Sequence, residues 1–131
     1  MGKLIKDYDY VIIDNEAGLE HLSRRTTRSA DILIIVSDAT PIGLKAAGRI
    51  SNLAKELNIK IKKEFLIINC CDKDIEKEKI KDLKLDYLGI LPRDIEIEKI
   101  SLNGQSPLDL KEDAISLGVL RRLGEKIWQR N

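Results

Sequence analysis

The sequence has few of the residues on which disulfide frameworks and metal clusters depend. Only two of its 131 residues are cysteine, at the adjacent positions Cys70 and Cys71, and only one is histidine. Adjacent cysteines do not make a disulfide framework, and in a strand they point to opposite faces, where they chelate one ion poorly. We therefore expect both cysteines to be packing residues.

Long apolar runs and an excess of charge are also missing. The apolar stretches are a handful of residues long, far below the roughly 20 that a membrane-spanning helix needs. The 23 basic and 22 acidic residues leave a net charge of +1, so we expect no strong attraction to nucleic acid or to a membrane surface. No apolar signal segment is visible near Met1, and we expect a single cytoplasmic domain over residues 1–131.

The sequence does contain short apolar runs that alternate with helical patterns. Runs that are apolar without alternation are typical of parallel strands buried on both faces. The predicted strands are Tyr8–Asp14, Asp31–Asp38, Glu64–Asn69 and Tyr87–Pro92, and the predicted helices cover 19–28, 42–57, 72–82, 95–101 and 113–129. This order predicts an α/β fold, a Rossmann-like parallel sheet of about four strands flanked by helices.

The helix predicted over 42–57 has clear start signals. Thr40 is suited to the N-cap and Pro41 to the first helical position. The helical spacing of apolar residues predicts one apolar stripe, which comprises Ala46, Ile50, Leu53, Ala54 and Leu57. The polar residues predicted to face away from it are Lys45, Arg49, Asn52, Lys55 and Glu56. Gly43 and Gly48 weaken the helix, which indicates close packing or movement there.

The run that ends at Asp14 is the main functional candidate. Open α/β sheets place their ligands at the carboxyl ends of strands, and a carboxylate there can hold magnesium beside phosphates. Gly18 would let the backbone turn away or approach a phosphate without a Cβ clash. The alternative is that Asp14 only caps the helix that follows, as the aspartates at the ends of many parallel strands do.

The longer string Ile13-Asp-Asn-Glu-Ala-Gly-Leu-Glu-His-Leu-Ser-Arg-Arg-Thr-Thr-Arg28 resembles the switch region of CooC-type ATPases. These are accessory proteins of carbon monoxide dehydrogenase and acetyl-CoA synthase maturation, in the MinD/ParA branch of P-loop ATPases. The run from Asp14 to His21 is the specific part, because the wider branch usually has proline at the position of Glu16. The resemblance covers residues 8–128 and implies a three-layer, P-loop NTPase-like fold.

The resemblance also implies roles for the residues of the switch region. In the intact family, with ATP and magnesium as cofactors, Asp14 would organise magnesium through water, and Glu16 and Gly18 would sense the γ-phosphate. His21 and Arg24 would lie at a subunit interface. Taken alone, His21 is also explained as a structural hydrogen-bonding residue, and Arg24 as a basic residue near a helix C-terminus.

Three further residues match the adenine-binding segments of the family. Asn69 ends a predicted strand, and its amide carries both the donor and the acceptor that an adenine edge requires. Pro92 and Asp94 match a Pro-x-Asp loop that wraps the adenine ring. Without the resemblance, Asn69 is a turn former and Asp94 a helix cap.

The phosphate cradle of the family has no counterpart in the sequence. None of the eight glycines begins or ends a Gly-x-x-x-x-Gly-Lys-Ser/Thr motif, so we expect no tight ATP binding by this chain alone. In the family, the strand before that loop lies between the strands matching Tyr8–Asp14 and Asp31–Val36. We expect these two strands to close up directly or to be bridged by another chain, because unpaired buried amides are too costly.

Two functions remain open at this point. The first is the C-terminal portion of a CooC-like ATPase that inserts nickel into a client enzyme, with a homodimer or a complementing P-loop-bearing chain as partner. The second is a non-catalytic α/β dimerisation or interaction module. The resemblance favours the first, and the missing phosphate loop leaves the second open.

Overall fold

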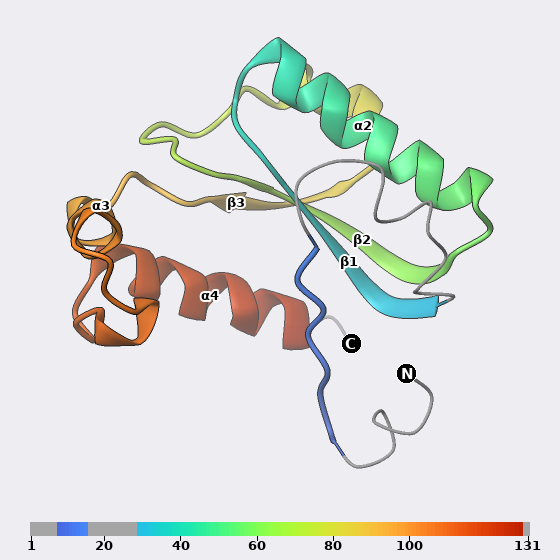
Figure 1. The fold of residues 1–131 in the computed structure, drawn as a ribbon. Helices are drawn as coiled ribbons and strands as arrows, with labels where there is room; N and C mark the ends of the chain where they lie inside the picture. Colours follow the sequence, from blue (N-terminus) through green and yellow to red (C-terminus); the bar gives the residue numbers. More distant parts are fainter. Residues whose placement is uncertain (1–7, 16–28, 130–131) are drawn as a thin grey trace.

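The structure is a computed structural model, and it describes residues 8–15 and 29–129. Its centre is a parallel sheet with the strand order β1–β2–β3 (Figure 1). The strands are β1 (Ser29–Ser37), β2 (Lys60–Ile68) and β3 (Asp86–Ile90). The predicted α/β class with a parallel sheet is therefore confirmed.

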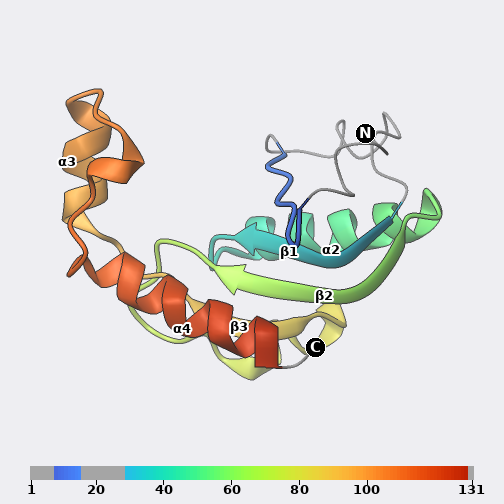
Figure 2. The same cartoon turned by 90° about the horizontal axis from the view of Figure 1, so that it is seen from below.

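Helices cover both faces of the sheet. Figures 1 and 2 show α2 (Pro41–Glu56) on one face, α4 (Ile115–Gln129) on the other, and α3 (Ile95–Leu102) beyond the end of the sheet. The prediction of a helix over 72–82 is wrong, because the chain forms two 3₁₀ turns there, η2 (Lys77–Lys79) and η3 (Lys81–Leu83). So short and charged a segment lacks the apolar stripe that would stabilise a longer helix. A third 3₁₀ turn, η4 (Pro107–Asp109), lies beside α3.

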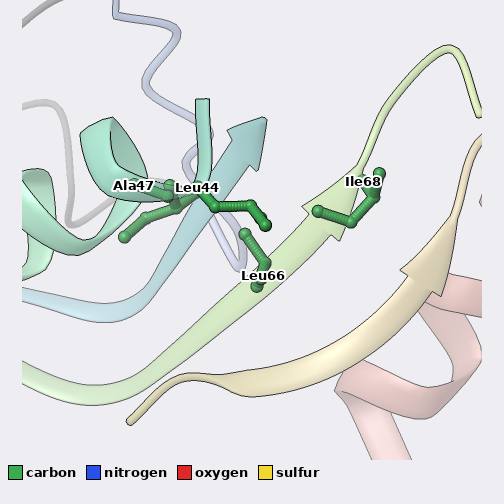
Figure 3. Close-up of a cluster of buried hydrophobic side chains, with 5 residues drawn as sticks. Leu44, Ala47, Leu66 and Ile68 are labelled. Carbon is green, nitrogen blue, oxygen red and sulfur yellow. The ribbon is translucent and has the colours of Figure 1, made fainter. Parts of the chain in front are cut away.

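Alternate side chains of the strands form a core on each face. The cluster under α2 comprises Ile35, Leu44, Ala47, Leu66 and Ile68, and the cluster under α4 comprises Phe65, Ile67, Leu88, Leu123 and Ile127. Figure 3 shows Leu44 and Ala47 of α2 near Leu66 of β2, with Ile68 farther along the same strand. Burying each large apolar side chain contributes about 1.5–3 kcal/mol, so β2 supplies much of the stability.

The start of α2 agrees with the prediction, and its buried stripe agrees in part: Ala54 is buried, and Ile50, Leu53 and Leu57 are partly buried. The Thr40 hydroxyl accepts the Gly43 N–H at 3.0 Å, and Pro41 is the first helical residue. The buried side chains are Leu44, Ala47, Ser51 and Ala54, whereas Ala46 of the predicted stripe is exposed. Periodicity did not reveal the burial of Ser51, whose hydroxyl donates to the Glu64 carboxylate of β2.

The strand predicted over Tyr8–Asp14 is not formed. Residues 8–15 have no regular secondary structure, and the Ile12 side chain is 90% exposed. A strand needs a neighbour for its backbone hydrogen bonds, and within the described ranges β1 pairs with β2 alone. Direct closure of this segment onto β1 is therefore also wrong, and the described sheet has three strands. The helix predicted over 19–28 lies outside the described residues.

One part of the α4 face of the sheet is uncovered. Ile32 packs against the cluster under α4, but Ile34 and Val36, which point the same way along β1, are 43% and 55% exposed. The Tyr10 ring meets Trp128 of α4 edge-on, with ring centroids 5.8 Å apart. The segment 8–15 therefore reaches the end of α4, and exposed apolar side chains are found on both. None of the described helices has the length and apolarity needed to cross a membrane.

The first testable prediction concerns Gly43 at the start of α2. A Cβ there would lie 2.1 Å from Asp38 Oδ1 and 2.9 Å from Ser37 Oγ, so Gly43→Ala should lower the free energy of unfolding by about 1–3 kcal/mol. The control is Gly118→Ala in α4, where the nearest atom is 3.9 Å away and alanine raises helix propensity by up to about 1 kcal/mol. Urea unfolding measures both, and an unchanged stability of Gly43→Ala would contradict the close approach.

Candidate functional site

The carboxyl ends of the three strands lie together at one edge of the sheet. The Asn69 N–H donates to the Ser37 carbonyl at 2.7 Å, which joins the ends of β2 and β1. The Leu91 N–H donates to the Ile68 carbonyl at 2.7 Å, which joins β3 to β2. Open parallel sheets bind ligands at this edge, so the loops after the three strands form the candidate site.

The loop after β1 carries a fixed negative charge. Asp38 Oδ1 accepts the Thr40 hydroxyl and the Thr40 backbone N–H, the latter at 2.9 Å. These two hydrogen bonds hold the pKa of Asp38 below its usual value, so the carboxylate stays ionised at neutral pH. No role was expected for Asp38, although an aspartate two residues before Thr-Pro is itself a turn signal. Its role here is to hold the entry into α2.

The loop after β2 presents Asn69 and two cysteines with different surroundings. Asn69 is exposed at the edge, where its side chain is accessible. Cys71 is partly buried against the core under α2, and its thiol donates to the Lys73 carbonyl at 3.0 Å. Cys70 is exposed, with a φ of 53° in the left-handed region that side chains seldom adopt. The predicted packing role is thus confirmed for Cys71 and wrong for Cys70.

Metal-binding groups do not gather in this part of the chain. Within residues 8–15 and 29–129, no three histidine, cysteine, aspartate or glutamate side chains are arranged to hold a metal ion. The described loops therefore supply single polar groups, not a preformed metal cluster.

The loop after β3 is anchored by Asp94. This side chain is 7% exposed; its Oδ1 accepts the Glu96 N–H and its Oδ2 accepts the Ser116 N–H, each at 3.0 Å. Hydrogen bonds from Ser116, and then from Glu96, hold the pKa of Asp94 below its usual value. Asp94 therefore caps α3 and joins it to the start of α4, which is the helix-cap interpretation of this residue. A contact with adenine stays a prediction.

A hollow of about 370 Å³ lies beside this loop. Its walls come from the residues after Pro92 and from the segment that leads into α4, including Arg93, Glu96 and Lys111. The Arg93 N–H also donates to Asp72 Oδ1 at 3.2 Å, which ties the loop after β3 to the loop after β2. The hollow is therefore next to the place where the resemblance puts the adenine ring.

The structure brings together some of the predicted site residues and separates others. Asn69 and Pro92 follow neighbouring strands at the same edge. Asp14 is exposed in the segment outside the sheet, so its predicted place at a strand end is wrong for the described chain, and its metal role stays a prediction. Glu16, Gly18, His21 and Arg24 lie outside the described residues.

Comparison with curated proteins finds relatives that bind ATP. The chain is 40% identical over 130 residues to the ATP-binding protein MJ0685 of Methanocaldococcus jannaschii, covering 97% of this chain and 51% of that protein. It is 33% identical over 129 residues to the carbon monoxide dehydrogenase accessory protein CooC of Rhodospirillum rubrum, covering 92% of this chain and 48% of CooC. No protein-family model matches the sequence.

A solved structure supports the fold. The cell division ATPase MinD of Pyrococcus furiosus superimposes with a TM-score of 0.71 and 22% sequence identity, covering 98% of this chain and 56% of MinD. This similarity confirms the P-loop NTPase-like fold that the resemblance implies. The chain spans about half the length of the relatives it matches.

The second testable prediction concerns the charge on Asp94. Because its pKa lies below the usual 3.8 in the folded chain, its carboxylate stabilises the fold above that value, and the effect is lost as the pH falls through the folded pKa. Asp94→Asn should be less stable than the parent chain at about pH 7, with a difference that shrinks toward about pH 2. Urea unfolding at both pH values tests this, with the exposed Glu112→Gln as control; a pH-independent difference would contradict a charge effect.

Proposed function

Because the chain is a partial member of the CooC- and MinD-type P-loop ATPases, we propose that it is the C-terminal portion of such an ATPase, active only with the phosphate-binding portion. The observation that carries this proposal is the extent of the similarity. It runs through 97% of this chain but only 51% of MJ0685. The sequence lacks the glycine-rich loop that cradles phosphates, so the rest of the ATPase would have to supply it.

The free edge of β1 is where the phosphate-binding portion would attach. Among the described residues this edge has no strand beside it, and Ile34 and Val36 next to it are exposed. A strand added there would pair its backbone groups with β1 and would cover apolar surface. The exposed run Tyr10–Ile13, rich in β-branched residues, would then pair with the far edge of the added strand.

This pairing would bring Asp14 to the ligand edge of the sheet. As the last residue of a completed strand, Asp14 would hold magnesium through water, with Glu16 and Gly18 beside the γ-phosphate. Asn69, Pro92 and Asp94 would hold the adenine, and His21 and Arg24 would lie at the subunit interface. Positioning and charge neutralisation supply most of the catalysis in phosphoryl transfer, so the chain alone should hydrolyse ATP negligibly.

The finer cellular role is a second part of the proposal. The similarity to CooC supports a cytoplasmic accessory protein that couples ATP binding to nickel insertion into a carbon monoxide dehydrogenase. The free β1 edge also supports the alternative, an interaction module that pairs with another chain without catalysis. ATP-dependent nickel transfer by the joined portions distinguishes them, because the interaction module predicts none.

The third testable prediction is an ATP titration by calorimetry. The chain alone should give no binding heat with magnesium and ATP, and the chain mixed with the phosphate-binding portion of a relative such as MJ0685 should bind ATP with micromolar affinity. In the mixture, Asp14→Asn should lower ATP hydrolysis by about a hundredfold, since it removes a charge that acts on the phosphates through magnesium. Asp9→Asn, five residues earlier in the same exposed segment, should change hydrolysis little. Micromolar binding by the chain alone would refute the proposal.

The fourth testable prediction concerns self-association. Without the phosphate-binding portion, the apolar surface beside β1 should draw two copies of the chain together, and sedimentation should detect a dimer. Ile34→Lys should shift the equilibrium to the monomer, because it places a charge on that surface. Ile42→Lys, at a side chain of α2 that is 83% exposed, is the control and should leave the dimer intact. A monomeric parent chain would contradict the prediction.

A further inference from the structure

A basic groove lies along α2, away from the ligand edge of the sheet. It is a hollow of about 500 Å³ between α2 and the turn η3. The close approach of the two elements depends on Gly48, because a Cβ there would lie 3.1 Å from Leu83 Cδ2. Leu83 is itself packed against the core under α2, so the floor of the groove is fixed.

Positive charges predominate along the walls of this groove. Lys45, Arg49 and Lys55 come from α2 and Lys84 follows η3, whereas Asp82 is the one acidic side chain among the described residues that line it. Lys55 Nζ lies 3.7 Å from Glu64 Oε2 and donates to the Ser51 hydroxyl at 3.0 Å. No carboxylate within residues 8–15 and 29–129 lies within 4 Å of the ammonium or guanidinium groups of Lys45, Arg49 and Lys84.

The stability of the helix explains only Lys55, which lies in the last turn where the helix dipole favours a cation. Lys45 and Arg49 are four residues apart, so they lie on the same side of α2, where two like charges destabilise a helix by about 0.2–0.5 kcal/mol. The only acidic residue of the helix is Glu56 in its last turn, seven residues beyond Arg49, so no i,i+3 or i,i+4 ion pair within the helix offsets the charges of Lys45 and Arg49. The charges are therefore better explained by an anion that binds from outside.

The shape of the groove identifies the class of anion. Lys45 and Lys55 are ten residues apart, which is about 15 Å along a helix. A single phosphate is too small to reach cations along that length, whereas about five residues of extended peptide span it. No aromatic side chain lines the groove in the described part of the chain, so a nucleobase has no ring to stack on. We propose that this groove docks an acidic peptide segment of a partner protein.

A peptide titration with charge-reversal variants tests the proposal. The probe is a fluorescein-labelled ten-residue peptide of alternating glutamate and alanine, followed by fluorescence anisotropy at low salt. The double variant Lys45→Glu, Arg49→Glu should weaken binding by about tenfold, since two attractions become repulsions. The control Arg121→Glu, Arg122→Glu reverses two exposed charges on α4, on the opposite face of the sheet, and should change affinity less than twofold.

Amide NMR spectra of the parent chain give a second measurement that needs no variant. Added peptide should shift the amide signals of Gly48, Asn52 and Leu83, which border the groove. Failure of the peptide to bind, equal losses in both double variants, or shifts confined to other surfaces would overturn the proposal. So would inorganic tripolyphosphate, if it displaced the peptide and produced the same shifts at a lower concentration, because the groove would then be a phosphate site.

Discussion

The central strand β2 pairs with a neighbour along each edge, and the carboxyl half of this strand is buried on both faces. The side chains of residues 65–68 are at most 5% exposed, alternating between the cluster under α2 and the cluster under α4. Backbone hydrogen bonds at its carboxyl end hold the ends of β1 and β3 at one edge of the sheet. The Asn69 N–H donates to the Ser37 carbonyl and the Leu91 N–H donates to the Ile68 carbonyl, each at 2.7 Å. The loops after the three strands come together because this pairing is parallel, so the candidate site depends on β2.

Much of this arrangement could be predicted from local patterns. The strands predicted over 31–38, 64–69 and 87–92 come from apolar runs and overlap β1, the second half of β2 and β3, and the start of α2 comes from Thr40 and Pro41. The charged first half of β2 was not predicted, because it is held by its pairing with β1. Features that depend on distant partners could not be predicted. Ser51 of α2 is buried where it bonds to Glu64 of β2, and the groove depends on the approach of Leu83 to Gly48.

The structure of the segment 8–15 also depends on a distant partner and could not be predicted from local patterns. Its apolar, β-branched residues have the pattern of a buried strand, yet they lie outside the sheet with Ile12 90% exposed. Local propensity for a strand cannot be satisfied without a neighbouring strand, and in the described part of the chain β1 has only β2 beside it. The unformed strand and the uncovered apolar surface agree with the proposed account, in which a further strand pairs with β1. The groove on α2 has a different origin, because it lies between α2 and the turn η3, which precedes β3 in the chain.

The central claim is that a strand from the phosphate-binding portion of the ATPase completes this sheet. Amide hydrogen exchange of the chain, alone and joined to that portion, tests it most directly, because paired backbone amides exchange slowly. We expect the amides of residues 10–14 to exchange rapidly in the chain alone and to become protected in the joined protein, together with the β1 amides on the edge away from β2. If exchange at both segments were the same in the two states, no strand would have been added there, and the account would be contradicted.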